Sequence, residues 1–331
     1  MPEKIYMYDD DTLKWEHEGK QYCLHVRSDS NPESPRSWSN LCTMACWHKR
    51  YTLGDDIGNV SEEEFWQRLV RQHVSDEDVT KAAMDGKLDG IRIAKSEDEP
   101  DCYDIFETCY LAGWQSPKEA KEYLEYSEVE PRAIADYIMD DLTVGHCQTL
   151  LEPYIEWMPL WLYDHSGITI SCGARSGQYA DRWDSGCVGW VIADKEKLMK
   201  ETRRLVLGED GKPIRIEHKH EDGTSTYSFE SEPLTEETWR EEAVRHMESE
   251  VEVYDQYLRG DVYGYQLYVN CGDEEEPDWN EEDSCWGFFG DDIMENGILD
   301  QAYGYGLKEA IEENRYETGK AALRTVSYYD F

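Results

Sequence analysis

Asp164, His165 and Asp184 are the side chains best suited to acid–base chemistry, because two carboxylates lie close in sequence to an imidazole. With a nearby hydroxyl or thiol, such a set could provide a nucleophile, a base and an orienting carboxylate. Neighbouring residues of a strand point to opposite faces, so Asp164, His165 and Ser166 cannot form a relay among themselves. The alternative is a turn whose Asp and Ser side chains bond their own backbone. If the protein is a hydrolase-like or metal-dependent enzyme, we expect Asp164, His165 and Asp184 to be catalytic.

Cys42, Cys46 and His48 have the residue types of a zinc site. Their spacing is not that of a standard zinc-finger half, and a second pair of ligands would have to come from elsewhere, for example from His146 and Cys147. Two buried thiols beside an amphipathic histidine explain the same residues without a metal. We therefore predict no metal site, and place any metal at Cys42, Cys46 and His48. Because the chain has no P-loop, GxGxxG or HExxH motif, we also predict no cofactor.

The most unusual property of the sequence is its net charge. Asp and Glu number 73 against 33 Lys and Arg, which gives a formal charge of −40. Such a charge repels nucleic acids and anionic membranes, so we expect neither direct nucleic-acid binding nor membrane binding. One explanation is solubility or a salty cytoplasm. The other is a basic protein partner that the acidic residues contact.

The acidic residues gather in short clusters, and two of these lie in expected loops at 96–104 and 273–283. Each cluster alone is typical of a solvated face, whereas together they could approach the charge density of duplex DNA, about one charge per 1.7 Å of axis. A rigid acidic surface would be steered into a basic nucleic-acid channel. No calcium-binding loop pattern is present. The predicted partner-binding residues are Glu97, Asp98, Glu99, Asp101, Asp273, Glu274, Glu275, Glu276, Glu281, Glu282 and Asp283.

The elements that position these residues predict an α+β fold with mixed, mostly antiparallel sheets and packed amphipathic helices. Strand-forming arms flank a polar loop within 160–191, and hairpins are expected over 1–30 and 214–229. Capping signals predict helices that start at Ser61, Ser116 and Thr235, and Gly260 should end the last of them. A boundary near residue 155 would divide the chain into an N-terminal region, 1–155, and a C-terminal region, 156–331, unless it forms a single domain.

The composition and the first residues of the sequence limit the classes of protein to which the chain could belong. Twelve Trp and 23 Tyr distinguish the chain from a disordered acidic tail. No apolar run reaches the ~20 residues that span a bilayer, and the first residues do not read as a signal peptide. We therefore expect a cytoplasmic protein whose ten cysteines are reduced and mostly buried.

Several segments resemble an uncharacterised group of phage and integrative-element proteins. These tend to carry WxNLxTMxCWH[RK]RYxLGD, then YDHSG and WDSGxVG. The matching segments here are 38–55, 163–167 and 183–189, and Tyr254–Gly264 and Ser284–Gly287 also look similar. Cys42 stands where the group is expected to have Gly. The resemblance assigns no catalytic residue; it implies a mobile-element accessory gene, for which counter-defence is a common role.

These observations lead to three hypotheses. The first is a non-enzymatic phage protein of a bacterial host's cytoplasm that inhibits a nucleic-acid-targeting defence complex, such as a restriction, CRISPR or Gabija-like nuclease, through a DNA-mimicking surface. The second is the enzyme centred on His165. The third is an assembly-forming binder, a homo-oligomer whose aromatic motifs make protein contacts.

Overall fold

The computed structural model describes residues 4–109, 121–180, 183–208, 210–220, 225–273 and 276–320. These residues form eight α-helices and sixteen strands in antiparallel pairs, which confirms the predicted α+β class. The chain divides into two compact units. Unit 1 contains Met1–Asn40, Pro159–Cys187 and Glu248–Phe331, and unit 2 contains Leu41–Met158 and Val188–Met247. One of the four crossings, at Met158, lies close to the boundary expected near residue 155.

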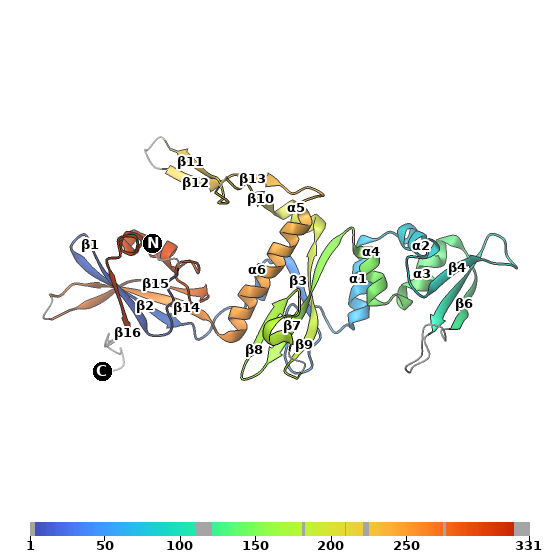
Figure 1. Ribbon diagram of the computed structural model, residues 1–331, viewed down its shortest axis with the longest axis horizontal. Helices are drawn as coiled ribbons and strands as arrows, with labels where there is room; N and C mark the ends of the chain where they lie inside the picture. Colours follow the sequence, from blue (N-terminus) through green and yellow to red (C-terminus); the bar gives the residue numbers. More distant parts are fainter. Residues whose placement is uncertain are drawn as a thin grey trace. The chain divides into compact units, whose positions relative to one another are not determined.

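Unit 1 contains a five-stranded antiparallel sheet (Figure 1). In spatial order its strands are β15 (Trp279–Phe289), β14 (Val262–Asn270), β2 (Lys20–Ser28), β1 (Asp11–His17) and β16 (Tyr316–Lys320). Alternate residues such as Leu13, Leu24 and Leu267 point to one face and form a core with α7 (Ile298–Gln301) and α8 (Leu307–Glu312). The sheet therefore has one face covered by short helices.

The first hairpin differs from the sequence prediction in the bounds of its first strand and its turn. We expected the polar segment 9–20 to connect two strands, but most of it is β1 itself, with Trp15 buried. The turn is only Glu18 and Gly19, both at positive φ (51° and 74°), as a two-residue hairpin turn requires. Ile5 and Met7, expected in the first strand, instead hydrogen-bond through their backbones to residues 291–293.

The core of unit 2 is built around Trp66 on α1 (Glu62–His73). The predicted N-cap is confirmed, because the hydroxyl of Ser61 accepts a hydrogen bond from the backbone N–H of Glu64 at 3.1 Å. Trp66 is fully buried, with the rings of Trp157 and Trp190 each packed edge-on at 5.8 Å. The second core helix is α4 (Val144–Leu151).

A three-stranded antiparallel sheet packs against the helical part of unit 2 (Figure 1). It consists of β4 (Ile91–Lys95), β5 (Tyr103–Cys109) and β6 (Lys121–Val129), with α2 (Asp76–Met84) and α3 (Ile134–Ile138) beside it. The predicted turns of helix over 131–142 are confirmed, since α3 is flanked by 3-10 turns. The helix signal at Ser116 lies outside the described residues, and the residues that follow it form β6 rather than a helix.

The predicted strands of the 160–191 stretch are confirmed as β7 (Ile155–Asp164), β8 (Ile168–Cys172) and β9 (Ser185–Asp194). Within unit 1, the end of β7 and β8 form a hairpin. Within unit 2, β9 pairs with β3 (Cys42–Cys46).

The motif residues Gly54, Asp55 and Gly189 hold β3 in place. Met44 and Asp55 exchange two hydrogen bonds, from Asp55 N to Met44 O at 2.8 Å and from Met44 N to Asp55 Oδ2 at 2.9 Å. A Cβ atom on Gly54 would lie 2.3 Å from Met44 O, and one on Gly189 would lie 1.9 Å from Ala45 O. These motif residues thus have a structural role, because a side chain would not fit at either glycine.

The remaining elements follow β9 in the chain. They are α5 (Lys195–Glu201), β10 (Arg203–Leu205), the hairpin of β11 (Arg215–Lys219) and β12 (Ser225–Phe229), β13 (Ser231–Pro233) and α6 (Trp239–Arg259). Gly260, at φ +77°, ends α6 as predicted. Over the described ranges, none of these helices is both long enough and apolar enough to cross a bilayer.

Candidate functional site

The structure places the proposed catalytic residues at the β7–β8 turn. His165 is exposed, its ring stacks on that of Tyr163 at 6.0 Å, and its Nδ1 lies 3.4 Å from the hydroxyl of its neighbour Ser166. Asp164 and Asp184 meet through the backbone, where Asp164 N donates to Asp184 O at 2.8 Å. These contacts are those of an exposed hairpin turn.

The proposed metal ligands do not converge on one point. Cys42 and Cys46 lie four residues apart on β3, about 13 Å along the strand, too far to share a zinc ion with bonds of about 2.3 Å. The Nδ1 atom of His48 accepts from the backbone N–H of Tyr51 at 3.2 Å, with the two rings stacked at 5.1 Å. In the part of the chain that the structure describes, no cluster of His, Cys, Asp or Glu could hold a metal.

The acidic segment of unit 2 lies in the tight connection between β4 and β5, as predicted. The hydroxyl of Ser96 accepts from the backbone N–H groups of Asp98 and Glu99 at 3.4 Å each. The side chains of Glu97, Asp98, Glu99 and Asp101 are exposed. Turn geometry thus keeps four carboxylates within five residues at one end of the sheet.

The strands beside this turn extend the negative charge. Burial, and then the negative charges of Glu99, Glu130, Glu128 and Asp101, raise the pKa of the Cys102 thiol. Burial, and then the charges of Asp141 and Glu125, raise the pKa of Glu107. Burial is the larger cause, and the smaller contributions of Asp141 and Glu125 show that these two carboxylates lie near Glu107. We call the strands β4–β6, with the carboxylates at 97–101, 107, 125, 128, 130 and 141, the acidic sheet.

The acidic sheet also exposes large apolar side chains. The exposed fractions are 43% for Tyr123, 52% for Leu124 and 45% for Tyr137. Tyr137 packs on Tyr126, whose ring centroid is 4.8 Å away and whose hydroxyl lies 3.4 Å from Asp141 Oδ2. Tyr123 and Leu124 are neighbours on β6 and point to opposite faces of the sheet, whereas Tyr137 lies on α3 beside Tyr126. Exposed aromatic side chains are enriched at interaction surfaces.

The second acidic segment, in unit 1, is partly strand rather than loop. We expected a loop over 273–283, but β15 begins at Trp279, so Glu281, Glu282 and Asp283 lie on an edge strand. Pairing with β14 outweighs the low strand propensity of carboxylate residues, which are common on edges because they prevent further pairing.

The carboxylates of this segment have different contacts. Asp273 accepts from the backbone N–H of Glu276 at 2.8 Å in the turn, and Asp283 accepts from the hydroxyl of Tyr265 at 2.8 Å. Glu281 accepts from Gln266 at 3.2 Å, while Glu282 is exposed. Glu274 and Glu275 lie outside the described residues.

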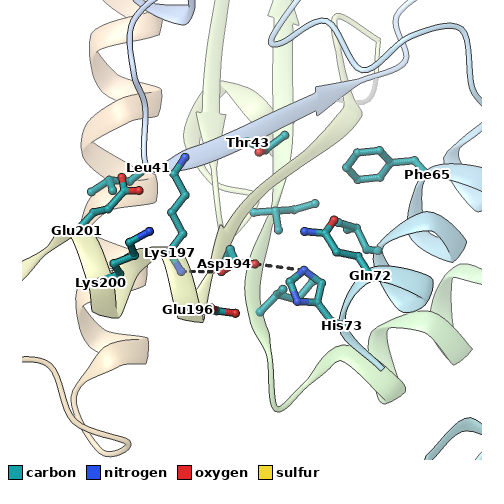
Figure 2. A pocket seen from close by; sticks show the side chains of 13 residues that line it. Leu41, Thr43, Phe65, Gln72, His73, Asp194, Glu196, Lys197, Lys200 and Glu201 are labelled. Carbon is teal, nitrogen blue, oxygen red and sulfur yellow. Dashed lines mark hydrogen bonds and ion pairs between the residues drawn. The ribbon is translucent and has the colours of Figure 1, made fainter. Parts of the chain in front are cut away.

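A cleft in unit 2, of about 580 Å³, was not predicted (Figure 2). His73, at the end of α1, faces Asp194, with 3.1 Å between Nε2 and Oδ2. Asp194 also caps α5 by accepting from the backbone N–H of Lys197 at 2.8 Å. A carboxylate that fixes a histidine ring is a common part of acid–base sites, although the same contact also joins α1 to α5. The sequence assigns His73 only to a helix face, and no local pattern relates it to Asp194.

Comparison with known proteins identifies no relative of this chain. No family model, curated protein or solved structure matches the chain. Functional inference therefore depends on the surfaces themselves.

Proposed function

We propose that the protein binds a positively charged protein partner through the acidic sheet of unit 2, and that this partner is a host defence protein or complex that acts on nucleic acids. The observation that carries the proposal is the combination of neighbouring carboxylates with exposed side chains on β6, Tyr123 and Leu124, and on the adjacent helix α3, Tyr137. Binding would block the partner's nucleic-acid channel, because the acidic sheet presents the charge that such a channel attracts.

Charge alone does not distinguish this function from solubility. Crowding carboxylates costs free energy through like-charge repulsion, and a solubility role is met equally well by dispersed charges. A basic partner removes the repulsion on binding, and the exposed ring of Tyr123, on the same strand as Glu125, provides apolar contact area beside the carboxylates. Solubility therefore explains the net charge but not its arrangement on the acidic sheet.

The resemblance to phage and integrative-element proteins supports a counter-defence role. A protein that acts by occupying a channel needs no catalytic centre, which fits the exposed position of His165 at a hairpin turn. We infer an inhibitor rather than an enzyme.

The test is inhibition of defence in living cells. The chain is expressed in bacteria that carry restriction, CRISPR or Gabija-like systems, and the plating efficiency of a targeted phage is measured. We compare it with the variant E97Q/D98N/E99Q/D101N, which neutralises the β4–β5 turn. A matched control, D300N/E309Q/E312Q/E317Q, removes the same number of charges from exposed positions of unit 1.

We expect the natural chain and the control to restore plating on at least one system, and the turn variant to lose at least tenfold of that effect. Co-purification of the partner should weaken as salt is raised, because exposed charges are screened. Inhibition that survives neutralisation of the turn would exclude the acidic sheet. Absence of inhibition across the systems would exclude the defence role.

A further inference from the structure

A pocket of about 480 Å³ in unit 1 combines aromatic walls with carboxylates. Trp38 and Phe289 form one side and pack edge-to-face at 5.4 Å and 89°. Trp38 and Tyr6 remain 46% and 53% exposed. The pocket is also lined by Gln256 and Gly287, so three segments singled out in the sequence, around Trp38, Gln256 and Gly287, meet here.

The residues that line this pocket include a buried carboxylate with unused hydrogen-bonding capacity. Asp292 is 7% exposed, and its Oδ1 accepts from the backbone N–H groups of Ile5 at 3.0 Å and Met294 at 3.1 Å. Its Oδ2 is buried and, among the described residues, has no hydrogen-bond partner. A buried carboxylate oxygen left unpaired is costly, so a donor that reaches it, once the side chains that cover this oxygen move aside, gains a strong, charge-assisted hydrogen bond.

The charge around Asp292 favours a cation. Glu252, Asp291 and Glu295 line the same pocket, against the single ammonium group of Lys4 among the lining residues. Lys4 lies 4.0 Å from Glu295 and is about half exposed. The negative charge of Glu295, and more weakly that of Asp292, raises the pKa of Lys4. The pocket thus already attracts one cation of its own chain.

We propose that this pocket binds the guanidinium group of an arginine side chain from a protein partner. The flat guanidinium stacks on an aromatic face and donates several hydrogen bonds in one plane, which matches an indole wall beside an unpaired carboxylate oxygen. A lysine ammonium group would be attracted by the carboxylates but could not stack flat on the Trp38 indole. This inference concerns unit 1 and stands independently of the acidic sheet.

The test measures binding of N-acetyl-arginine amide to the full chain by NMR, at 150 mM salt to suppress diffuse attraction to the net charge. The neutral isostere N-acetyl-citrulline amide is the ligand control. We expect binding on the order of 1 mM, typical of a weak single-group ligand. Shifts should appear at the Trp38 indole, and the citrulline compound should bind at least fivefold more weakly.

Three variants separate this site from diffuse attraction. Asp292→Asn keeps an oxygen for Ile5 and Met294 but places an amide where the guanidinium must donate, and should weaken binding about tenfold. Trp38→Leu should weaken it severalfold without touching a charge. Lys4→Met should tighten binding severalfold, because it removes the competing ammonium group.

Glu309→Gln, on α8 and outside the pocket, should change nothing. Equal binding of the citrulline compound, or an unchanged affinity in both Trp38→Leu and Lys4→Met, would overturn the proposal even if Asp292→Asn proved unstable. None of these variants alters the acidic sheet, so its role in inhibition is tested separately.

Discussion

Glu107 on β5 and Asp141 in the 3-10 turn after α3 repel each other: burial raises the pKa of Glu107, and the charge of Asp141 raises it further. The ionised form of Glu107 is therefore less stable in the folded protein than in the unfolded chain. Burial of Glu107 and its repulsion by Asp141 therefore lower the free energy of unfolding at neutral pH.

We predict that Glu107→Gln stabilises the protein at pH 7 by a few tenths of a kcal/mol, up to about 1 kcal/mol, as for other close like charges. Because the folded pKa is raised, natural Glu107 regains this stability as pH falls through that pKa. Below its ordinary value of 4.5 the difference between variant and natural chain should vanish. Urea unfolding of the variant and the natural chain at pH 7 and pH 4 measures the stabilisation and its disappearance at low pH.

Glu312→Gln, at an exposed position of α8, is the control and should shift stability little at either pH. A Glu107→Gln variant that is less stable than the natural chain at pH 7 would contradict the assigned repulsion.

Two glycines of β9 should respond differently to the same substitution. Gly189→Ala places a Cβ atom 1.9 Å from the carbonyl oxygen of Ala45, so β3 must move away from β9. We expect a loss of about 2–4 kcal/mol, at the large end for single substitutions. Gly186→Ala on the same strand meets nothing within 4 Å and should cost under about 1 kcal/mol. Thermal and urea unfolding of both variants measure the contrast.

The cysteines should differ in reactivity. The nine cysteines whose side chains the structure describes are all thiols: three are buried, four are half-buried, and Cys187 and Cys271 are exposed. Burial raises the pKa of Cys147 and Cys172 to about 12 and that of Cys23 to about 11. At pH 8 a thiol with a pKa near 12 is about 10⁻⁴ ionised, and the thiolate is the reactive form.

We therefore predict that iodoacetamide at pH 8 labels Cys187 and Cys271 within minutes, while Cys23, Cys147 and Cys172 react only after unfolding. Peptide mass spectrometry of native and urea-treated protein reads each site. Rapid native labelling of Cys147 would show that the core of unit 2 opens readily.

Local signals in the sequence were sufficient where one segment determines its own structure. The Ser61 cap and the acidic loop predicted over 96–104 follow from serine side chains that bond nearby backbone, and the helix stop at Gly260 follows from the positive φ that glycine adopts readily. Charge clustering also located the acidic turn, although it gave no indication of the crowding around Glu107.

The sequence failed where partners are distant in the chain. Trp279–Asp283 is a strand because β14 pairs with it, against its own composition. His73 meets Asp194 and Ile5 meets Asp292 through packing of remote segments, and no periodicity encodes such contacts. The cleft at His73 and the pocket at Asp292 could therefore be identified only from the three-dimensional structure.

The carboxylates of β15 provide the last prediction, because they divide into structural and available groups. Asp283 is half-buried and accepts from the Tyr265 hydroxyl, whose own pKa is raised by burial and then by this hydrogen bond. Tyr265→Phe should cost about 1–3 kcal/mol, because it leaves the Asp283 carboxylate without its donor. Glu282→Gln, on an exposed side chain of the same strand, should change stability by under about 0.5 kcal/mol.

Urea unfolding measures the two single variants and the double variant Tyr265→Phe/Asp283→Asn. A smaller loss of stability in the double variant than in Tyr265→Phe would identify the unpaired charge of Asp283 as the cause. Equal stability of Tyr265→Phe and the natural chain would instead make Asp283 as available to a partner as Glu282.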